Sequence, residues 1–251
     1  MSFGITIVQL QLALRQPGCP ICSMQEQAGA RYISNLLWES VNDVETRERI
    51  IASLGYCPKH TLLLASMEVN RHGSAMGTSI IYEHLAQVVI HRLETWRPEK
   101  GLPQWLIPIR RVLAWLKIVP ARRPPSQNVL SVESPCRVCQ IAEGSAQFAL
   151  LNLLEELEVH LDDWGPLLAA SDGLCLQHLR DCLDNYSEIH PEATQHLVKD
   201  TIRRLEDREK RMNEYIRKHA WDARHEAITP AEHRSWKETL SFFSGYPPSR
   251  F

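Results

Sequence analysis

The stretches Cys19-Pro-Ile-Cys22 and Gly55-Tyr-Cys57-Pro-Lys-His60 recur in the second half of the chain as Cys136-Arg-Val-Cys139 and Gly173-Leu-Cys175-Leu-Gln-His178. In each copy a CxxC pair precedes a GxCxxH knuckle at nearly the same separation: 34 residues lie between Cys22 and Cys57, and 35 lie between Cys139 and Cys175. Six of the seven cysteines belong to this frame. Chance would rarely produce the spacing twice, so the pattern predicts two metal sites.

Each copy contains three thiols and one imidazole, a closed tetrahedral set typical of structural zinc sites. We therefore expect one Cys3His site in each half, its two knuckles brought together by a helical hairpin. The predicted ligands are Cys19, Cys22, Cys57 and His60 for the first half, and Cys136, Cys139, Cys175 and His178 for the second.

Each knuckle has the form of a helix N-terminus. In the first, Cys19 is the expected N-cap, Pro20 occupies the first helical position and Cys22 the third. Side chains at these two positions converge above the first turn, where free N–H groups and the positive end of the helix dipole favour thiolate over thiol. Gly55 and Gly173, two residues before the third cysteine of each copy, allow a tight reversal into the helix.

The ligand set leaves the metal open. We favour two zinc ions. Iron–sulfur clusters are the alternative, since they also accept cysteine with an occasional histidine, and a metal-free dithiol switch is a third reading. The seventh cysteine, Cys182, is expected to be an ordinary buried cysteine, with a spare thiol at the second site as the alternative.

Hydrophobic periodicity predicts an all-α protein. Residues at helical spacing form one stripe in each half: Ile33, Leu36, Leu37 and Val41, then Leu150, Leu153, Leu154 and Leu157. The expected helices cover 21–40, 44–54, 58–70, 76–97, 103–118, 138–160, 164–171, 176–186, 191–220 and 230–243, with one extended segment at 5–14. The two halves align at an offset of 117 to 118 residues, which indicates an internal duplication.

The predicted organisation has three parts. Residues 1–97 form the first helical repeat, 98–127 a basic Pro/Arg-rich connecting segment, and 128–251 the second repeat with the C-terminal helices. Charge is balanced, with 28 Lys and Arg against 30 Asp and Glu. Another protein is therefore the expected partner; nucleic acid is an alternative through segment 110–123, which contains Arg110, Arg111, Lys117, Arg122 and Arg123 near Trp105 and Trp115.

Known catalytic and targeting motifs are missing from the sequence. It has no nucleophile elbow, phosphate-binding glycine loop, HExxH or dinucleotide fingerprint. No catalytic residue and no organic cofactor are therefore predicted, and we favour a non-enzymatic protein. The N-terminal stretch lacks the features of a secretory signal, and no apolar run is long enough to span a bilayer. We expect a soluble cytoplasmic protein.

These elements resemble a bacterial family known only as a domain of unknown function. The resemblance rests on an early CPxC, a GxCxxH followed by Leu62–Leu64, a second CxxC and GxCxxH, and a Trp-containing last helix in the tail at 221–245. The chain departs from the family pattern at Arg137-Val138, where the family has a Pro-led knuckle, and in its Pro/Arg-rich connecting segment. The resemblance implies the helical fold and the metal sites, and it implies no activity.

Overall fold

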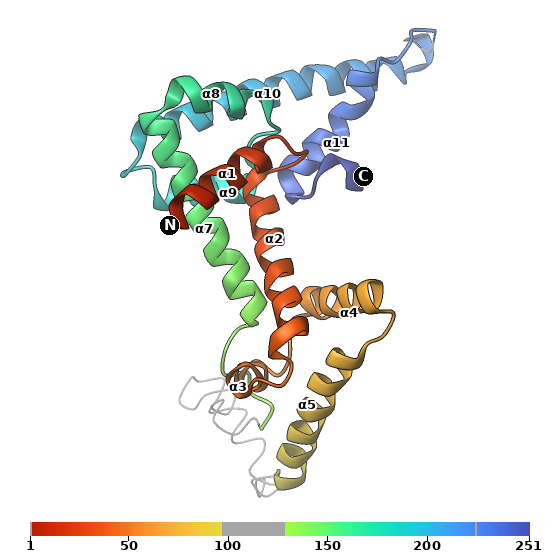
Figure 1. Cartoon of the computed structure of the whole chain (residues 1–251). Coiled ribbons are helices and arrows are strands. Elements are labelled where there is room, and N and C mark those ends of the chain that lie inside the picture. Colours follow the sequence, from red (N-terminus) through yellow and green to blue (C-terminus); the bar gives the residue numbers. More distant parts are fainter. Residues whose placement is uncertain (1, 97–128, 224) are drawn as a thin grey trace, which may run out of the picture. The chain divides into compact units, whose positions relative to one another are not determined.

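A computed structural model describes residues 2–96, 129–223 and 225–251 (Figure 1). Every regular element within these ranges is helical, which confirms the all-α prediction. The α-helices are α1 (Ser2–Leu14), α2 (Pro20–Asn35), α3 (Val44–Ala52), α4 (Pro58–His72), α5 (Met76–Thr95), α7 (Arg137–Val159), α8 (Leu161–Ala170), α9 (Leu176–Asn185), α10 (Pro191–Lys218) and α11 (Pro230–Ser244). A π-helical turn follows α2 at Leu36–Ser40, and 3-10 turns lie at Trp221–Ala223 and Pro248–Arg250. The helix expected at 103–118 falls outside the described residues.

The extended N-terminal segment expected at 5–14 was wrong, because this stretch belongs to helix α1. Its β-branched residues favour strand by propensity. However, Leu10, Ala13 and Leu14 follow helical spacing, and all three are buried in a hydrophobic core with residues of α7 and α8. Burial of this face outweighs the local preference, as tertiary packing commonly does.

The described chain forms two compact units. Unit 1 comprises Met1–Arg31 and Ile141–Phe251, and unit 2 comprises Tyr32–Gln140. This division differs from the three consecutive parts expected from the sequence, since unit 1 combines the N-terminal helix with most of the second half. The unit boundaries fall within the residue ranges of α2 and α7.

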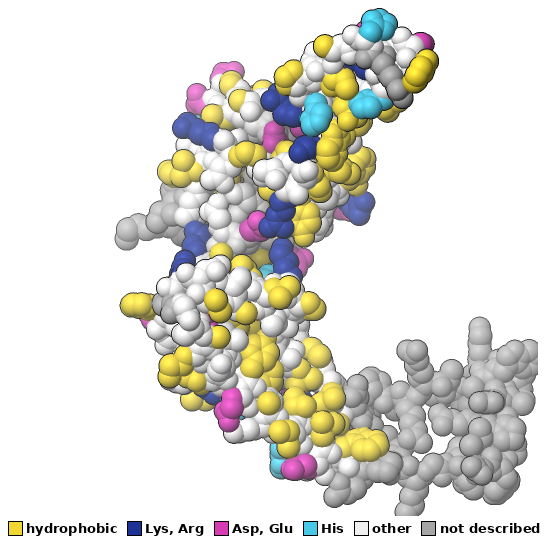
Figure 2. All heavy atoms as spheres, turned by 90° about the vertical axis from the view of Figure 1, so that its right-hand side faces the viewer, with side chains coloured by type: hydrophobic (Ala, Val, Ile, Leu, Met, Phe, Trp, Pro, Cys, Tyr) yellow, Lys and Arg dark blue, Asp and Glu magenta, His cyan; other side chains and the backbone are white. Residues whose placement is uncertain are grey.

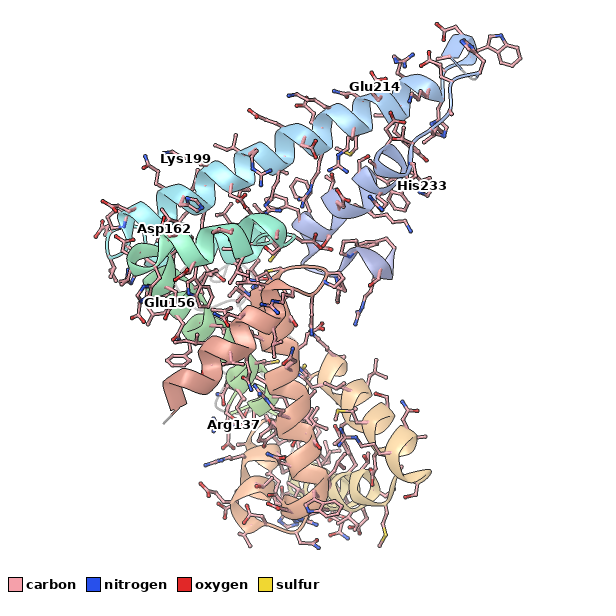
Figure 3. All side chains as sticks on the ribbon, turned by 45° about the horizontal axis from the view of Figure 1, so that its top comes forward. Arg137, Glu156, Asp162, Lys199, Glu214 and His233 are labelled. Atoms are coloured by element: carbon pink, nitrogen blue, oxygen red, sulfur yellow. The ribbon has the colours of Figure 1, made fainter. Side chains whose placement is uncertain are left out.

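Unit 1 is built around the leucine stripe of α7. Leu150, Leu153, Leu154 and Leu157 are at most 2% exposed, so the predicted core face is confirmed. Helices α10 and α11 run side by side as a hairpin, and charged side chains such as Lys199 and Glu214 follow the length of α10 (Figures 1 and 3).

The hairpin of α10 and α11 is tied together by ion pairs. Arg211 contacts Glu238 at 2.8 Å, and Lys218 contacts Glu232 at 2.8 Å. Glu232 also completes a capping box with Thr229 at the start of α11. The sequence predicts this cap, because Thr, Pro and Glu stand at the N-cap, first and third helical positions.

Unit 2 has a smaller core, formed by buried side chains from the end of α2, the π-helical turn, helices α3, α4, α5 and α7, and the connection between α3 and α4: Ile33, Leu36, Ile50, Tyr56, Leu64, Ile81 and Val138. Helices α4 and α5 form a second hairpin. The N-cap of α5, Ala75, makes no capping hydrogen bond through its side chain. Instead the buried carboxylate of Glu68, on α4, accepts hydrogen bonds from the N–H groups of Gly77 at 2.6 Å and Thr78 at 2.8 Å, and from the Thr78 hydroxyl.

Replacing Glu68 with Ala removes this cap and leaves two N–H groups at the start of α5 without their acceptor. We expect the free energy of unfolding to fall by about 2–3 kcal/mol, because hydrogen bonds to a charged group are lost in a buried setting. Urea unfolding of the metal-loaded chain measures the change. Glu83→Ala, on the exposed surface of α5, is the control and should change it by no more than about 0.5 kcal/mol. Equal stability of the two variants would contradict the capping role.

Candidate metal centres

All four knuckles lie at helix N-termini, as predicted. Cys19, Cys57, Cys136 and Cys175 each immediately precede a helix, and the carbonyl oxygen of each accepts the first helical hydrogen bond, at 2.9–3.2 Å. The second ligand of every knuckle is the third residue of its helix. Gly55 and Gly173 have φ values of +95° and +77°, which confirms the tight reversal expected before Cys57 and Cys175.

The four N-termini meet in pairs and form two groups with four ligand atoms each. Site 1 consists of Cys19, Cys22, Cys175 and His178, and site 2 consists of Cys57, His60, Cys136 and Cys139. Within each group all four ligand atoms lie within 4.8 Å of one another, and each group could hold a metal ion.

At site 1 the starts of α2 and α9 face each other. His178 Nδ1 lies 3.5, 3.4 and 3.2 Å from the sulfurs of Cys19, Cys22 and Cys175. The sulfurs of Cys22 and Cys175 are 3.6 Å apart. A backbone contact holds the two knuckles together, since the N–H of Gly18 donates to the Asp172 carboxylate at 2.6 Å.

Site 2 repeats this arrangement with the starts of α4 and α7. His60 Nδ1 lies 3.2, 3.6 and 3.3 Å from the sulfurs of Cys57, Cys136 and Cys139. The sulfurs of Cys57 and Cys139 are 3.6 Å apart. The segment before Cys136 is attached to the end of α3, where the Ala52 carbonyl accepts from the N–H groups of Glu133 and Ser134 at 2.8 and 3.2 Å.

The eight predicted residues therefore come together, but their pairing corrects the expectation of one site per half. Each site takes its CxxC from one half of the chain and its CxxH from the other. Helix length gives the reason. Helix α2 has 16 residues and carries the chain about 24 Å along its axis, whereas α3, with 9 residues, spans only about 14 Å and is too short to return it.

The same mismatch occurs in the second half, where α7 has 23 residues and α8 has 10. A hairpin that returned the chain from Cys139 to Cys175 would need two helices of similar length. Each CxxH knuckle pairs with the CxxC of the other half.

The cysteine that begins each CxxH knuckle has a lowered thiol pKa, which favours the thiolate. For Cys57, burial alone would raise the pKa of the thiol, but hydrogen bonds from the N–H of His60, from Cys139 and Cys136, and from the N–H of Lys59 lower it overall. For Cys175, hydrogen bonds from Cys19 and Cys22 lower the pKa, against the opposite effect of burial. A thiolate is the form that binds a metal ion, so both sites contain a cysteine prepared for this role.

A small cavity borders site 1 and contains a buried arginine. The cavity is lined by Cys19 and Cys175 of site 1, by Arg208 from α10, and by the acidic residues Asp172 and Glu238. Arg208 is 7% exposed and donates a hydrogen bond to the Asp172 carbonyl at 3.3 Å. Burial lowers the pKa of its guanidinium, while the neighbouring carboxylates oppose this effect. Three thiolates around a divalent ion carry a net negative charge, which Arg208 is placed to balance.

The seventh cysteine, Cys182, belongs to neither group. Cys182 is fully buried, and its sulfur lies 3.7 Å from the Thr194 hydroxyl, so it is an ordinary core cysteine as expected. The basic segment 110–123 lies outside the described residues. Arg208, Asp172 and the C-terminal residues that contact site 1 were missed by sequence reasoning. Arg208 and the C-terminal residues stand far from the knuckles in the chain. Asp172 directly precedes Gly173, but no local pattern distinguishes it.

Fold and site together define an all-α protein with two Cys3His groups that could bind metal. A family model described as a family of unknown function (DUF6062) matches residues 4–226, so the chain belongs to that family. No curated protein and no solved structure matches the chain. Within the described residues, none of the helices combines the length and the apolar character needed to cross a membrane.

Replacing Arg208 with Met removes the positive charge beside site 1 and keeps a long apolar side chain. We expect the affinity of site 1 for a metal ion, with zinc as the probe, to fall about tenfold or more, as is typical when the partners around metal ligands are changed. Competition with a chromogenic chelator measures it. Arg203→Met, on the same helix with a side chain 61% exposed, should bind zinc like the unaltered chain. Identical affinities for both variants would show that Arg208 does not act on the site.

Proposed function

We propose that this protein binds two zinc ions, one at each Cys3His site, and that the metal-bound helical body is a scaffold for interaction with another protein. The observation that carries the proposal is the close approach of four ligand atoms in each group, all within 4.8 Å. The zinc ions are structural: they hold together helix N-termini from distant parts of the chain.

The separations within each group support a single four-coordinate ion. Zinc binds sulfur at about 2.3 Å and nitrogen at about 2.0–2.1 Å, which places tetrahedral ligand atoms about 3.5–3.8 Å apart. The nearest ligand atoms at both sites are 3.2–3.6 Å apart. An iron–sulfur cluster spreads its thiolates over different iron atoms, so its ligands lie further apart than those of one ion. Clusters remain the alternative that metal analysis must exclude.

A protein partner is supported by the exposed surface. Hydrophobic side chains are visible on the face from which Figure 2 views the molecule. Helices α4 and α5 expose Leu62, Met76 and Ile90, whose residues are 72%, 69% and 54% exposed. Contiguous exposed apolar surface is typical of protein-binding sites, and we infer that these two helices contribute to such a surface. Paired cysteine knuckles are also more common in reducing compartments than in secreted proteins, and we extend the proposal to a cytoplasmic location.

Elemental analysis of the anaerobically purified protein tests metal identity. We expect about two zinc ions per chain and no iron, because each site offers four ligands for one tetrahedral ion. Several irons per chain would replace the proposal with an iron–sulfur electron-transfer or redox-sensing protein. A chain without metal would overturn both.

Removal of the metal tests the structural role. Structural zinc contributes directly to folding, and binding in zinc-finger peptides is worth about 10–16 kcal/mol at neutral pH. We therefore expect a chelator to reduce helical content by far-UV circular dichroism and to lower the melting temperature, with recovery when zinc is restored. Cys57→Ala should remove one zinc and destabilise unit 2. An unchanged spectrum and melting temperature after complete removal of zinc would contradict a structural role.

A further inference from the structure

The two sites have the same ligands but differ in exposure. At site 1, Cys19, Cys175 and His178 are 5%, 2% and 3% exposed. The fourth ligand of site 1, Cys22, is partly exposed. At site 2 His60 is buried, whereas Cys57 and Cys139 are both partly exposed. A thiolate must be reached by solvent before it reacts with a dissolved oxidant. The sulfur atoms of site 2 are therefore the more accessible of the two sets.

Site 1 is covered by the C-terminal segment. Helix α11 ends at Gly245 (φ +78°), and a Cβ atom at this residue would lie 3.1 Å from the sulfur of Cys22 and 3.7 Å from that of Cys175. Pro247 packs against Gly18, the residue before Cys19. A Cβ atom at Gly18 would lie 3.1 Å from Pro247. The C-terminus accordingly lies beside the turn between α1 and α2 (Figure 1). The backbone of this segment lies directly on the site 1 sulfurs.

We propose that site 2 is a peroxide-reactive thiolate centre, in which Cys57 and Cys139 form a disulfide with loss of the bound metal, while site 1 keeps its ion. This inference rests on the proposed metal binding. The two sulfurs are 3.6 Å apart and belong to different helices, and both residues are partly exposed. Because the S–S bond of a disulfide is about 2.05 Å long, the two sulfurs need to move only about 1.5 Å closer together.

The reaction balances with hydrogen peroxide as the oxidant. One thiolate attacks a peroxide oxygen, the O–O bond breaks, and a sulfenic acid and hydroxide result. The second thiolate attacks that sulfur, forms the S–S bond and releases a second hydroxide. The two sulfurs lose two electrons, the peroxide gains them, and two protons from solvent convert both hydroxides to water. With two of four ligands lost, site 2 no longer holds its ion.

The test uses the full chain loaded with two zinc ions. Hydrogen peroxide is added, and released zinc is followed with a chromogenic chelator. The remaining free thiols are alkylated, and mass spectrometry of the peptides then identifies which cysteines are reduced and which are in a disulfide. We expect one zinc to leave in a separate fast phase, together with a Cys57–Cys139 disulfide, while Cys19, Cys22 and Cys175 remain reduced. Simultaneous loss of both ions, earlier reaction at site 1, or no fast phase would overturn the inference. A disulfide between other cysteines of site 2 would overturn the assigned pair.

Two glycine variants test the cover over site 1. Gly245→Ala places a methyl group against Cys22 and should displace the segment, so that the second zinc leaves about tenfold faster. Gly73→Ala is the matched control: Gly73 also ends a 15-residue helix, at φ +63°, but a Cβ there meets nothing within 4 Å. Both variants share the strain of a left-handed alanine. Equal release of the second zinc by both would show that the C-terminal segment does not protect site 1.

The same experiment separates this inference from the proposed function. Zinc content before peroxide is added reports metal binding alone, so a chain that binds no zinc fails at that step and overturns both ideas. A chain that binds two zinc ions and loses them together overturns only the difference between the sites.

Discussion

The fold depends on helix N-termini that must meet in pairs. An unpaired N-terminus leaves several N–H groups without partners and a partial positive charge. Two facing N-termini would repel each other unless negative charge lay between them. In this protein the thiolates of two knuckles occupy that space, and a divalent cation among them would remove their mutual repulsion. The pairing α2 with α9 and α4 with α7 thus joins distant chain segments within each unit and determines which residues belong together.

The ligands could be predicted from the sequence because their signal is local. A cysteine before a helix and a second ligand at its third position are fixed by the geometry of one turn, and all eight residues were identified in this way. The pairing could not be predicted, because either CxxC can complete either CxxH chemically. Loop entropy does not decide which knuckles pair. Closing the loop between Cys22 and Cys175, 153 residues away, costs about 1 kcal/mol more in entropy than closing the loop between Cys22 and Cys57. That is small beside the roughly 10 kcal/mol or more of zinc binding. The unequal lengths of α2 and α3, and of α7 and α8, decide it.

Other features escaped prediction because their causes are not local. The β-branched residues of α1 favour an extended segment, and only the core formed with α7 and α8 makes the helix stable. The cap of α5 comes from Glu68, a residue of the preceding helix, where no capping motif exists in the sequence. Features with short-range causes were predictable, including the capping box at Thr229 and the leucine stripe of α7.

Repeated ligands do not make repeated chemistry, since reactivity also depends on what surrounds them. The knuckles recur in both halves, whereas site 1 is in addition bordered by residues of α10 and of the end of α11. These two helices bring Arg208 to the edge of site 1 and carry Gly245 onto its sulfurs. The positive charge of Arg208 would stabilise the thiolates, and the backbone at Gly245 would restrict access to them, so both would favour retention of a bound ion. Site 2 takes its ligands from the same motif, and in the part of the chain that the structure describes Cys57 and Cys139 are partly exposed. On the proposal made above, one motif used twice therefore gives a protected centre and an accessible one.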